Sequence, residues 1–179
     1  SDARRAAQTA MYIILDSLTR MIAPILAYTS DEIWKYMPHS SADDSENIIF
    51  NSMPEKADVH CDDAFATKWD RIHELRDTVK KSLETVIKDK TIRTSLEAAV
   101  TLKASGEEYE FIKSIESELT AAFIVSKVAV ENADVAELTV EVSKASGDKC
   151  ERCWAYSETV GEDSTHPTLC KRCADILNG

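Results

Sequence analysis

Two pairs of cysteines near the end of the sequence are the residues best suited to disulfide, redox or metal chemistry. Cys150 and Cys153 form one Cys-x-x-Cys pair, Cys170 and Cys173 form the other, and sixteen residues separate the pairs. Disulfide bonds are typical of small secreted domains, and nothing else in the sequence suggests secretion. A redox dithiol is expected singly, so redox chemistry would explain one pair at most. A separation of about 15 to 20 residues is typical of a zinc ribbon, and we predict that all four thiolates bind one Zn²⁺.

The predicted zinc site is closed, because four cysteines fill all four tetrahedral positions and leave none for water or substrate. Few large apolar residues surround it, so we expect metal binding to stabilise the segment, by about 10 to 16 kcal/mol as in zinc-finger peptides. His166 lies four residues before Cys170 and is a competing ligand, but we expect it to be a solvated loop histidine. The predicted role of the zinc is therefore structural.

Cationic and aromatic residues lie beside the cysteines. The cations are Lys149, Arg152, Lys171 and Arg172, and the aromatic residues are Trp154 and Tyr156. Four thiolates and one Zn²⁺ carry a net charge of about −2, which the cations would offset. The same cations can bind phosphates while the aromatic rings stack on bases. A third interpretation is that the segment docks onto another part of its own protein, and spacing alone does not choose among the three.

The first part of the chain, before the cysteine segment, shows mainly the apolar spacing that is typical of helices. Apolar residues recur every three or four positions between residues 4 and 23, which predicts a helix with one apolar face that ends near Pro24. Residues 29–32 have the form of a capping box and predict the start of a short helix. The polar, acidic stretch 40–47 is typical of an exposed loop. A second long helix is predicted over 63–88.

The pattern changes after the second long helix. Residues 98–102 predict a strand, 107–119 a helix, and 122–130 and 138–142 two strands rich in β-branched residues. The small, polar stretch 143–148 is typical of a linker. This order indicates a small α/β module between the helices and the cysteines.

We therefore predict an α+β fold with three parts. The parts are helices at 1–58, a long helix with an α/β connector at 59–147, and a four-cysteine zinc ribbon at 148–179.

The chain is acidic as a whole, with 21 Lys and Arg against 32 Asp and Glu and a net charge of −11. This balance is the opposite of that expected for a protein that coats nucleic acid. The stretch 68–93 differs, because it carries eight basic and five acidic residues. A solvated helix face explains such a pattern, and phosphate contacts are the alternative. The candidates for phosphate contact are Lys80, Lys81, Lys88, Lys90 and Arg93.

No targeting signal is evident. No apolar run approaches the roughly 18 residues of a membrane span, and the first residues lack the apolar core of a signal peptide. We therefore expect a cytoplasmic location without membrane contact. The first residue is not Met, and the sequence runs directly into a helical pattern, which indicates a fragment of a larger protein.

The cysteine segment resembles a known zinc element. Residues 149–154 read Lys-Cys-Glu-Arg-Cys-Trp, Tyr156 and Val160-Gly161 follow, and the second cysteine pair closes the element. The pattern is similar to the C-terminal zinc element of bacterial isoleucyl-tRNA synthetases. Zinc elements of related form also end some DNA glycosylases, so this segment alone does not choose between the two families.

The resemblance extends, in order, over nearly the whole chain. Residues 4–8 (Arg-Arg-Ala-Ala-Gln), 23–26 (Ala-Pro-Ile-Leu) and 29–34 (Thr-Ser-Asp-Glu-Ile-Trp) are similar to the closing helices of the anticodon-binding domain in class I synthetases for isoleucine, valine and leucine. The Ser-Leu-Glu-Ala string at 95–98 resembles the segment after that domain in the isoleucine enzymes. Together these motifs favour the synthetase over the glycosylase.

The resemblance implies a C-terminal, tRNA-binding part of an enzyme that attaches isoleucine to its tRNA with ATP. The fragment itself is expected to be non-catalytic, because it lacks the family's nucleotide-binding motifs, and ATP would bind only in the catalytic domain of the parent. The expected partners are isoleucine-specific tRNA and the remaining domains of the same chain, in a monomer. The candidate tRNA contacts are Arg4, Arg5, Lys80, Lys81, Lys88, Lys90, Arg93, Arg152, Trp154, Lys171 and Arg172. The alternatives are a fragment of a DNA-repair glycosylase and a zinc module that serves only intramolecular docking.

Overall fold

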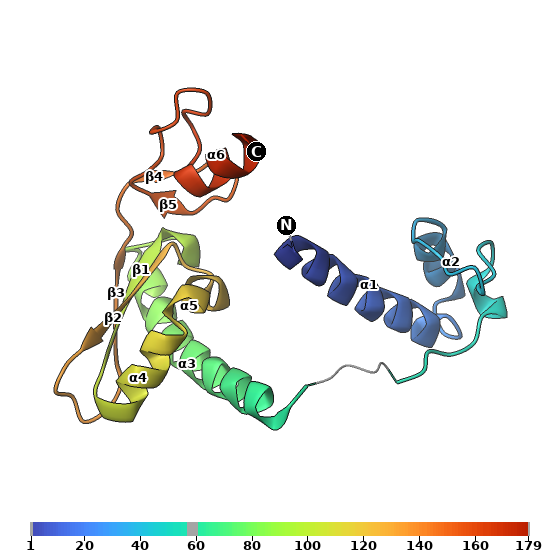
Figure 1. Ribbon diagram of the computed structural model, residues 1–179, viewed down its shortest axis with the longest axis horizontal. Helices are drawn as coiled ribbons and strands as arrows, with labels where there is room; N and C mark the ends of the chain where they lie inside the picture. Colours follow the sequence, from blue (N-terminus) through green and yellow to red (C-terminus); the bar gives the residue numbers. More distant parts are fainter. Residues whose placement is uncertain (1, 57–60, 179) are drawn as a thin grey trace. The chain divides into compact units, whose positions relative to one another are not determined.

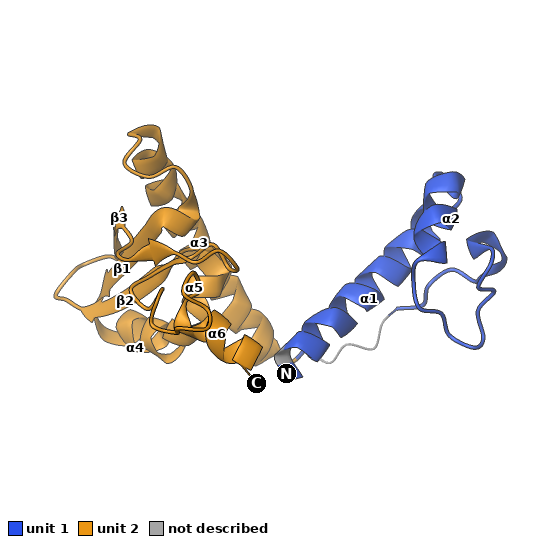
Figure 2. Cartoon of the chain, turned by 90° about the horizontal axis from the view of Figure 1, so that it is seen from above, with its two compact units in different colours: residues 1–61 blue, residues 62–179 orange. Residues whose placement is uncertain are grey.

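The computed structural model describes residues 2–56 and 61–178. The chain divides into two compact units, Ser1–Cys61 and Asp62–Gly179, which are coloured separately in Figure 2. The predicted boundary between residues 58 and 59 lies outside the described residues. Within the described ranges, no helix is long and apolar enough to cross a membrane.

Unit 1 is helical. It contains α1 (Asp2–Ile22), α2 (Ala27–Lys35) and a short 3-10 helix, η1 (Ile48–Phe50). The predicted capping box at 29–32 is wrong, because these residues lie inside α2. The amide of Ser30 already donates to the carbonyl of Leu26 at 2.9 Å, so the helical hydrogen bonds begin before the predicted cap.

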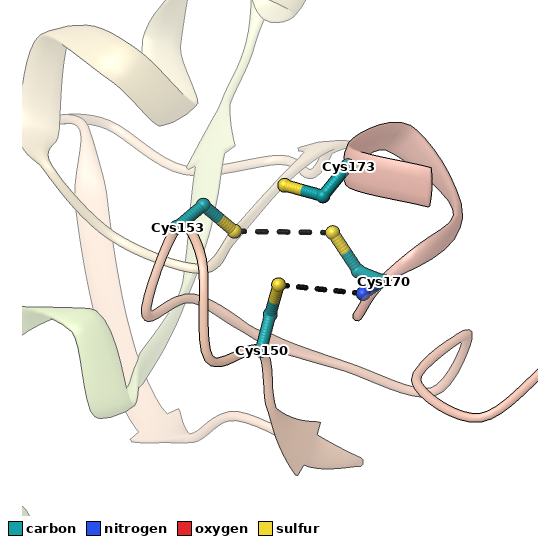
Figure 3. A group of neighbouring side chains, drawn as sticks. All are labelled: Cys150, Cys153, Cys170 and Cys173. Carbon is teal, nitrogen blue, oxygen red and sulfur yellow. Dashed lines mark hydrogen bonds between the residues drawn. The ribbon is translucent and has the colours of Figure 1, made fainter. Parts of the chain in front are cut away.

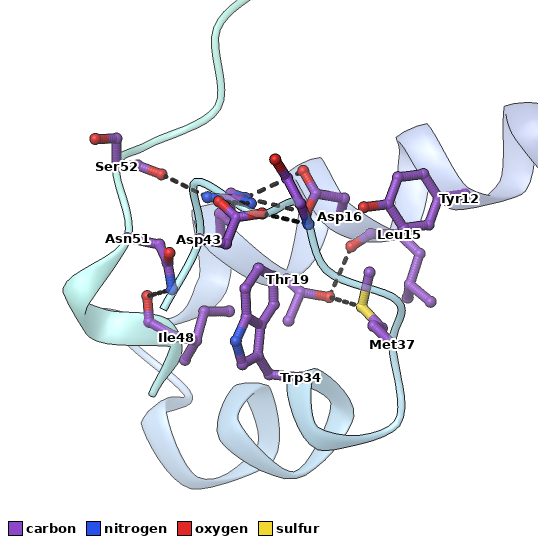
Figure 4. A network of polar contacts seen from close by, with 12 residues as sticks. Tyr12, Leu15, Asp16, Thr19, Trp34, Met37, Asp43, Ile48, Asn51 and Ser52 are labelled. Carbon is purple, nitrogen blue, oxygen red and sulfur yellow. Dashed lines mark hydrogen bonds and ion pairs between the residues drawn. The ribbon is translucent and has the colours of Figure 1, made fainter. Parts of the chain in front are cut away.

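Trp34 is the centre of the small core of unit 1, with no exposed surface, and Ala23, Met37 and Ile48 pack with it. The guanidinium of Arg20 lies 4.8 Å from the centre of the Trp34 ring and pairs with Asp43 at 2.9 Å. The Arg20 pair holds the pKa of Asp43 below its usual value, chiefly through the side-chain hydrogen bond. Figure 4 shows Asp43 and Trp34 in this network. Arg20 therefore joins the loop at 40–47 to the helices, together with the hydrogen bond that the indole N–H of Trp34 donates to the carbonyl of Asp44.

The apolar face of α1 is present as predicted, but it is largely uncovered within unit 1. Met11 is 69% exposed, and Ile14, Leu15 and Leu18 on the same side of the helix are exposed as well. Exposed apolar side chains gathered on one side of a helix are typical of an interaction surface.

Unit 2 begins with the long helix α3, which spans Asp63–Lys88 as predicted. The side chain of Asp62 caps it by accepting a hydrogen bond from the amide of Phe65 at 2.7 Å. A short 3-10 helix, η2 (Ser95–Glu97), leads into the first strand. The capping carboxylate and the apolar spacing thus both define this helix.

The sheet of unit 2 has the order β2-β1-β3. The central strand β1 (Ala98–Ala104) runs parallel to β2 (Lys127–Asn132) and antiparallel to β3 (Thr139–Lys144). Alternate residues of β1 are buried against the helices, which gives a two-layer arrangement (Figure 1). The core between the layers includes Ile72, Leu75, Val79, Leu83, Val100, Leu102, Ile112, Leu119 and Phe123.

Two predictions in this module need correction. The helix predicted at 107–119 is two helices, α4 (Gly106–Ser114) and α5 (Glu116–Phe123), because buried Ile115 leaves helical geometry between them. The strand predicted at 122–130 begins only at Lys127, because α5 continues to Phe123 and Ile124 then adopts a left-handed conformation. β-branched composition alone did not separate the end of a helix from a strand.

The cysteine segment completes unit 2 with the strands β4 (Asp148–Lys149) and β5 (Tyr156–Ser157) and the helix α6 (Lys171–Asn178). The two strands form an antiparallel pair. Helices and small mixed sheets together confirm the predicted α+β class.

Candidate metal centre

The sulfur atoms of four cysteines lie close together in unit 2. The Sγ atoms of Cys150, Cys153, Cys170 and Cys173 all lie within 4.8 Å of one another. Figure 3 shows the four side chains pointing toward one another. The Sγ atoms of Cys153 and Cys170 are 3.8 Å apart. Tetrahedral zinc with Zn–S bonds of about 2.3 Å requires sulfur atoms roughly 3.8 Å apart. The donor set and the spacing therefore fit Zn²⁺.

Local backbone geometry brings each pair of thiols together. Cys150 follows β4, and its carbonyl accepts from the amide of Trp154 at 2.8 Å, which closes a tight turn around Cys153. Cys170 immediately precedes α6, and the amide of Cys173 donates to its carbonyl at 2.9 Å. Each Cys-x-x-Cys turn thus directs two sulfur atoms to the same side.

The electrostatics of the cluster favour a bound cation. Burial acts to raise the pKa of Cys150, but hydrogen bonds from the amides of Cys153, Cys170 and Arg152 outweigh it and lower that pKa to about 6. Burial, together with hydrogen bonds to the neighbouring thiols, raises the pKa of Cys170 to about 12. Four adjacent thiolates repel one another, so a divalent cation is needed to keep all four deprotonated at neutral pH.

The four buried or half-buried cysteines supply all the ligands that a tetrahedral zinc accepts. The competing ligand His166 is not in this group of ligand atoms. A cluster with four protein ligands has no position for substrate. A metal bound by these four cysteines would therefore have a structural role.

The cysteine segment is joined to the α/β module through Ser126. The Ser126 hydroxyl donates to the carbonyl of Leu96, within the Ser-Leu-Glu-Ala string, and accepts from the amide of Tyr156 at 2.7 Å. One side chain thus links the start of the sheet to β5.

We predict that Ser126→Ala destabilises unit 2 by about 1 to 3 kcal/mol, because it leaves two part-buried backbone groups without their partner. Urea unfolding of the variant, with zinc content measured in parallel, checks this. Ser143→Ala, at an exposed position of β3, is the matched control. Equal stability of the two variants would contradict the bridging role.

The aromatic and cationic residues beside the cysteines lie at the surface. Trp154 is 60% exposed and has a left-handed backbone with φ of 65°. The Nζ atom of Lys149 lies 5.4 Å from the centre of its ring. Arg152, Lys171 and Arg172 are exposed on the same segment. Burial acts to lower the pKa of Arg172, but its hydrogen bond to the Cys153 sulfur and the charges of the nearby thiols raise it overall.

The candidate cations of α3 do not share one face. Lys81 and Lys88, seven residues apart, lie on the side opposite the buried residues, whereas Lys80 borders an apolar groove that Val79 and Leu83 also line. Lys90 and Arg93 are exposed in the turn after the helix. Arg4 and Arg5 belong to unit 1, where Arg5 pairs with Asp2 at 2.8 Å. Among the ion pairs of the described residues, this pair alone involves a candidate contact.

Sequence reasoning missed Arg76, which lines the same groove as Lys80. The signal in the sequence was the spacing of four residues between Arg76 and Lys80, which places both on one face of the predicted helix. It also missed a cleft beside the cysteines, formed by residues that are distant in sequence.

Comparison with known proteins matches two parts of this chain to described families. Residues 1–102 match the family described as the anticodon-binding domain of tRNA ligase, and residues 147–176 match the zinc finger found in FPG and IleRS. The chain belongs to the tRNA-ligase anticodon-binding family. The glycosylase alternative is not favoured, because more than half of the chain matches the tRNA-ligase domain.

The similar proteins are isoleucine–tRNA ligases, one kind of tRNA ligase. The ligase of Desulforamulus reducens is 44% identical over 97% of this chain, that of Thermoanaerobacter sp. is 44% identical over 99%, and that of Bacillus mycoides is 39% identical over 97%. The chain spans 20% of the length of each of these relatives.

Proposed function

We propose that this chain is the C-terminal tRNA-binding and structural-zinc region of an isoleucine–tRNA ligase. The observation that carries the proposal is the order of its parts, an anticodon-binding domain match followed by a closed four-cysteine cluster. The intact enzyme would attach isoleucine to its tRNA with ATP bound in a separate catalytic domain. This region would hold the anticodon arm so that the acceptor end of the tRNA reaches that domain.

Within this function, Cys150, Cys153, Cys170 and Cys173 would bind one structural Zn²⁺ and fix the shape of the last part of the chain. The rest of the ligase would cover the exposed apolar face of α1, whose residues Met11 and Ile14 have no core around them in unit 1. We further propose the three-part division at 1–58, 59–147 and 148–179, a monomeric state and a cytoplasmic location.

The tRNA would contact the exposed cations and Trp154. Phosphate groups attract unpaired Lys and Arg, and splayed anticodon bases stack on exposed aromatic rings. Trp154 supports this role, because a large apolar ring in a left-handed turn gains little from packing when it is mostly exposed. The candidate contacts remain those predicted from the sequence, in both units.

Charge reversal tests the contact against docking alone. Lys171→Glu and Arg152→Glu, each made in the full-length ligase, are expected to weaken tRNA binding about tenfold each and to reduce its salt dependence, with zinc content unchanged. Lys144→Glu is the matched control, because Lys144 is an exposed lysine of β3 that is not among the candidate tRNA contacts. Unchanged affinity in both Lys171→Glu and Arg152→Glu would favour the alternative that the zinc module only docks within its own protein.

A further inference from the structure

A cleft of about 420 Å³ separates helix α5 from the cysteine segment. Ser117, Thr120 and Ile124 line its α5 side, while Tyr156, Thr159 and Arg172 line the opposite side. The volume lies within the range of roughly 300 to 1,000 Å³ that is usual for ligand sites. Both walls belong to unit 2, so the cleft is a feature of a single compact body.

The charge of the cleft differs from that of the chain. Arg172 is the one cationic residue among the described residues that line it, none of these carries a carboxylate, and Cys153 and Cys170 of the candidate metal centre also line the wall. The whole chain, in contrast, has a net charge of −11. A guanidinium has five N–H donors, so Arg172 can hold a phosphate group in addition to the Cys153 sulfur.

The remaining lining residues are suited to a sugar and a base. The hydroxyls of Ser117 and Thr120 make no hydrogen bond to other described residues, although both face the cleft. On the opposite wall, the Oγ atoms of Ser157 and Thr159 are 2.8 Å apart. The half-buried ring of Tyr156 adds an aromatic surface. Hydroxyls and an aromatic ring beside a cation are the groups with which proteins hold an unstacked nucleotide.

Ile124 lines the cleft and has a backbone conformation that is costly for a β-branched residue. Its φ of 57° and ψ of 53° place it in the left-handed region, and it is 51% exposed. The amide of Val125 donates to the carbonyl of Thr120 at 3.2 Å, which forms the helix-ending turn where glycine is usual. A β-branched residue is an outlier there. Backbone strain of this kind is often found at binding sites, so Ile124 is a candidate for contact with a ligand.

We infer that this cleft binds one unstacked nucleotide of the tRNA anticodon arm, with Arg172 on its phosphate and with Tyr156 and Ile124 against its base. The inference rests on the proposed function, because it names the surface on which the region holds tRNA. A peptide fits less well. The lining supplies several hydroxyls and a single cation, whereas extended peptides are held by an exposed sheet edge or an apolar groove.

Filling the cleft tests the inference without disturbing the cysteines. In the full-length ligase, Ser117→Trp places a large side chain at an exposed position of the cleft wall. Its affinity for isoleucine-specific tRNA is expected to fall about tenfold, with zinc content and melting temperature unchanged. Ser114→Trp is the matched control, because Ser114 is an exposed serine at the end of α4 that does not line the cleft.

Ile124→Gly provides a second test that misfolding cannot explain. Glycine suits the left-handed turn, so the melting temperature should not fall, while tRNA affinity should fall because the apolar contact is lost. Wild-type affinity in Ser117→Trp and Ile124→Gly, together with weakened binding in Lys171→Glu, would overturn the cleft and leave the proposed function intact. Wild-type affinity in all of these variants would overturn both.

Discussion

Cys170→Ser is expected to remove zinc from the protein and to unfold the segment that follows β3. Cys170 is buried within the group of four sulfur atoms, and the amide of Cys170 itself donates to the Sγ atom of Cys150 at 3.3 Å. A serine hydroxyl is a poor substitute for a thiolate ligand, so the variant forfeits most of the roughly 10 to 16 kcal/mol that structural zinc contributes in comparable peptides. The small apolar cluster around the cysteines cannot replace it.

The fold of the α/β module should survive this substitution, because its core lies between the sheet and helices α3 to α5. The measurements are zinc content by metal analysis and amide hydrogen exchange of residues 148–178, followed by aminoacylation in the full-length ligase. Cys61→Ser is the matched control, since Cys61 is an exposed cysteine outside the cluster. Full zinc content and full aminoacylation in Cys170→Ser would contradict the structural role of the metal.

The cysteine cluster could be predicted from the sequence because its geometry is local. A Cys-x-x-Cys turn brings its own two thiols together, and only one loop closure is needed to join the two pairs. Helix α3 was predicted for a similar reason, since apolar spacing over 63–88 and the cap at Asp62 are both local signals.

Features that depend on tertiary contacts could not be predicted in the same way. Residues 29–32 have capping chemistry, yet they lie within α2, because the helical hydrogen bonds begin at Leu26. Ile124 has high strand propensity but ends a helix in a left-handed turn. The cleft brings together α5, which ends at Phe123, and the cysteine segment, which begins at Asp148, and no pattern within one segment encodes that contact.

The glycine at position 147 is visible in the sequence, but the steric reason that glycine is required there appears only in the fold. Gly147 has φ of 84°, and a Cβ atom there would stand 2.2 Å from the carbonyl carbon of Ser157. The same Cβ would lie 2.4 Å from the amide nitrogen of Glu158. The obstructing atoms are backbone atoms beside the pairing of β4 with β5, so no flexible side chain can move aside.

Gly147→Ala is therefore expected to destabilise unit 2 by about 3 to 5 kcal/mol, since left-handed strain and backbone overlap act together. Gly161→Ala is the matched control, because Gly161 has φ of 91° in the same segment, and its nearest contact would be an ordinary 3.6 Å. Gly161→Ala introduces only the left-handed strain and should lower the free energy of unfolding by about 1 to 2 kcal/mol. Urea unfolding with hydrogen exchange of residues 148–157 separates the two. Equal stability of both variants would show that the close approach of residue 147 to β5 does not hold the cysteine segment in place.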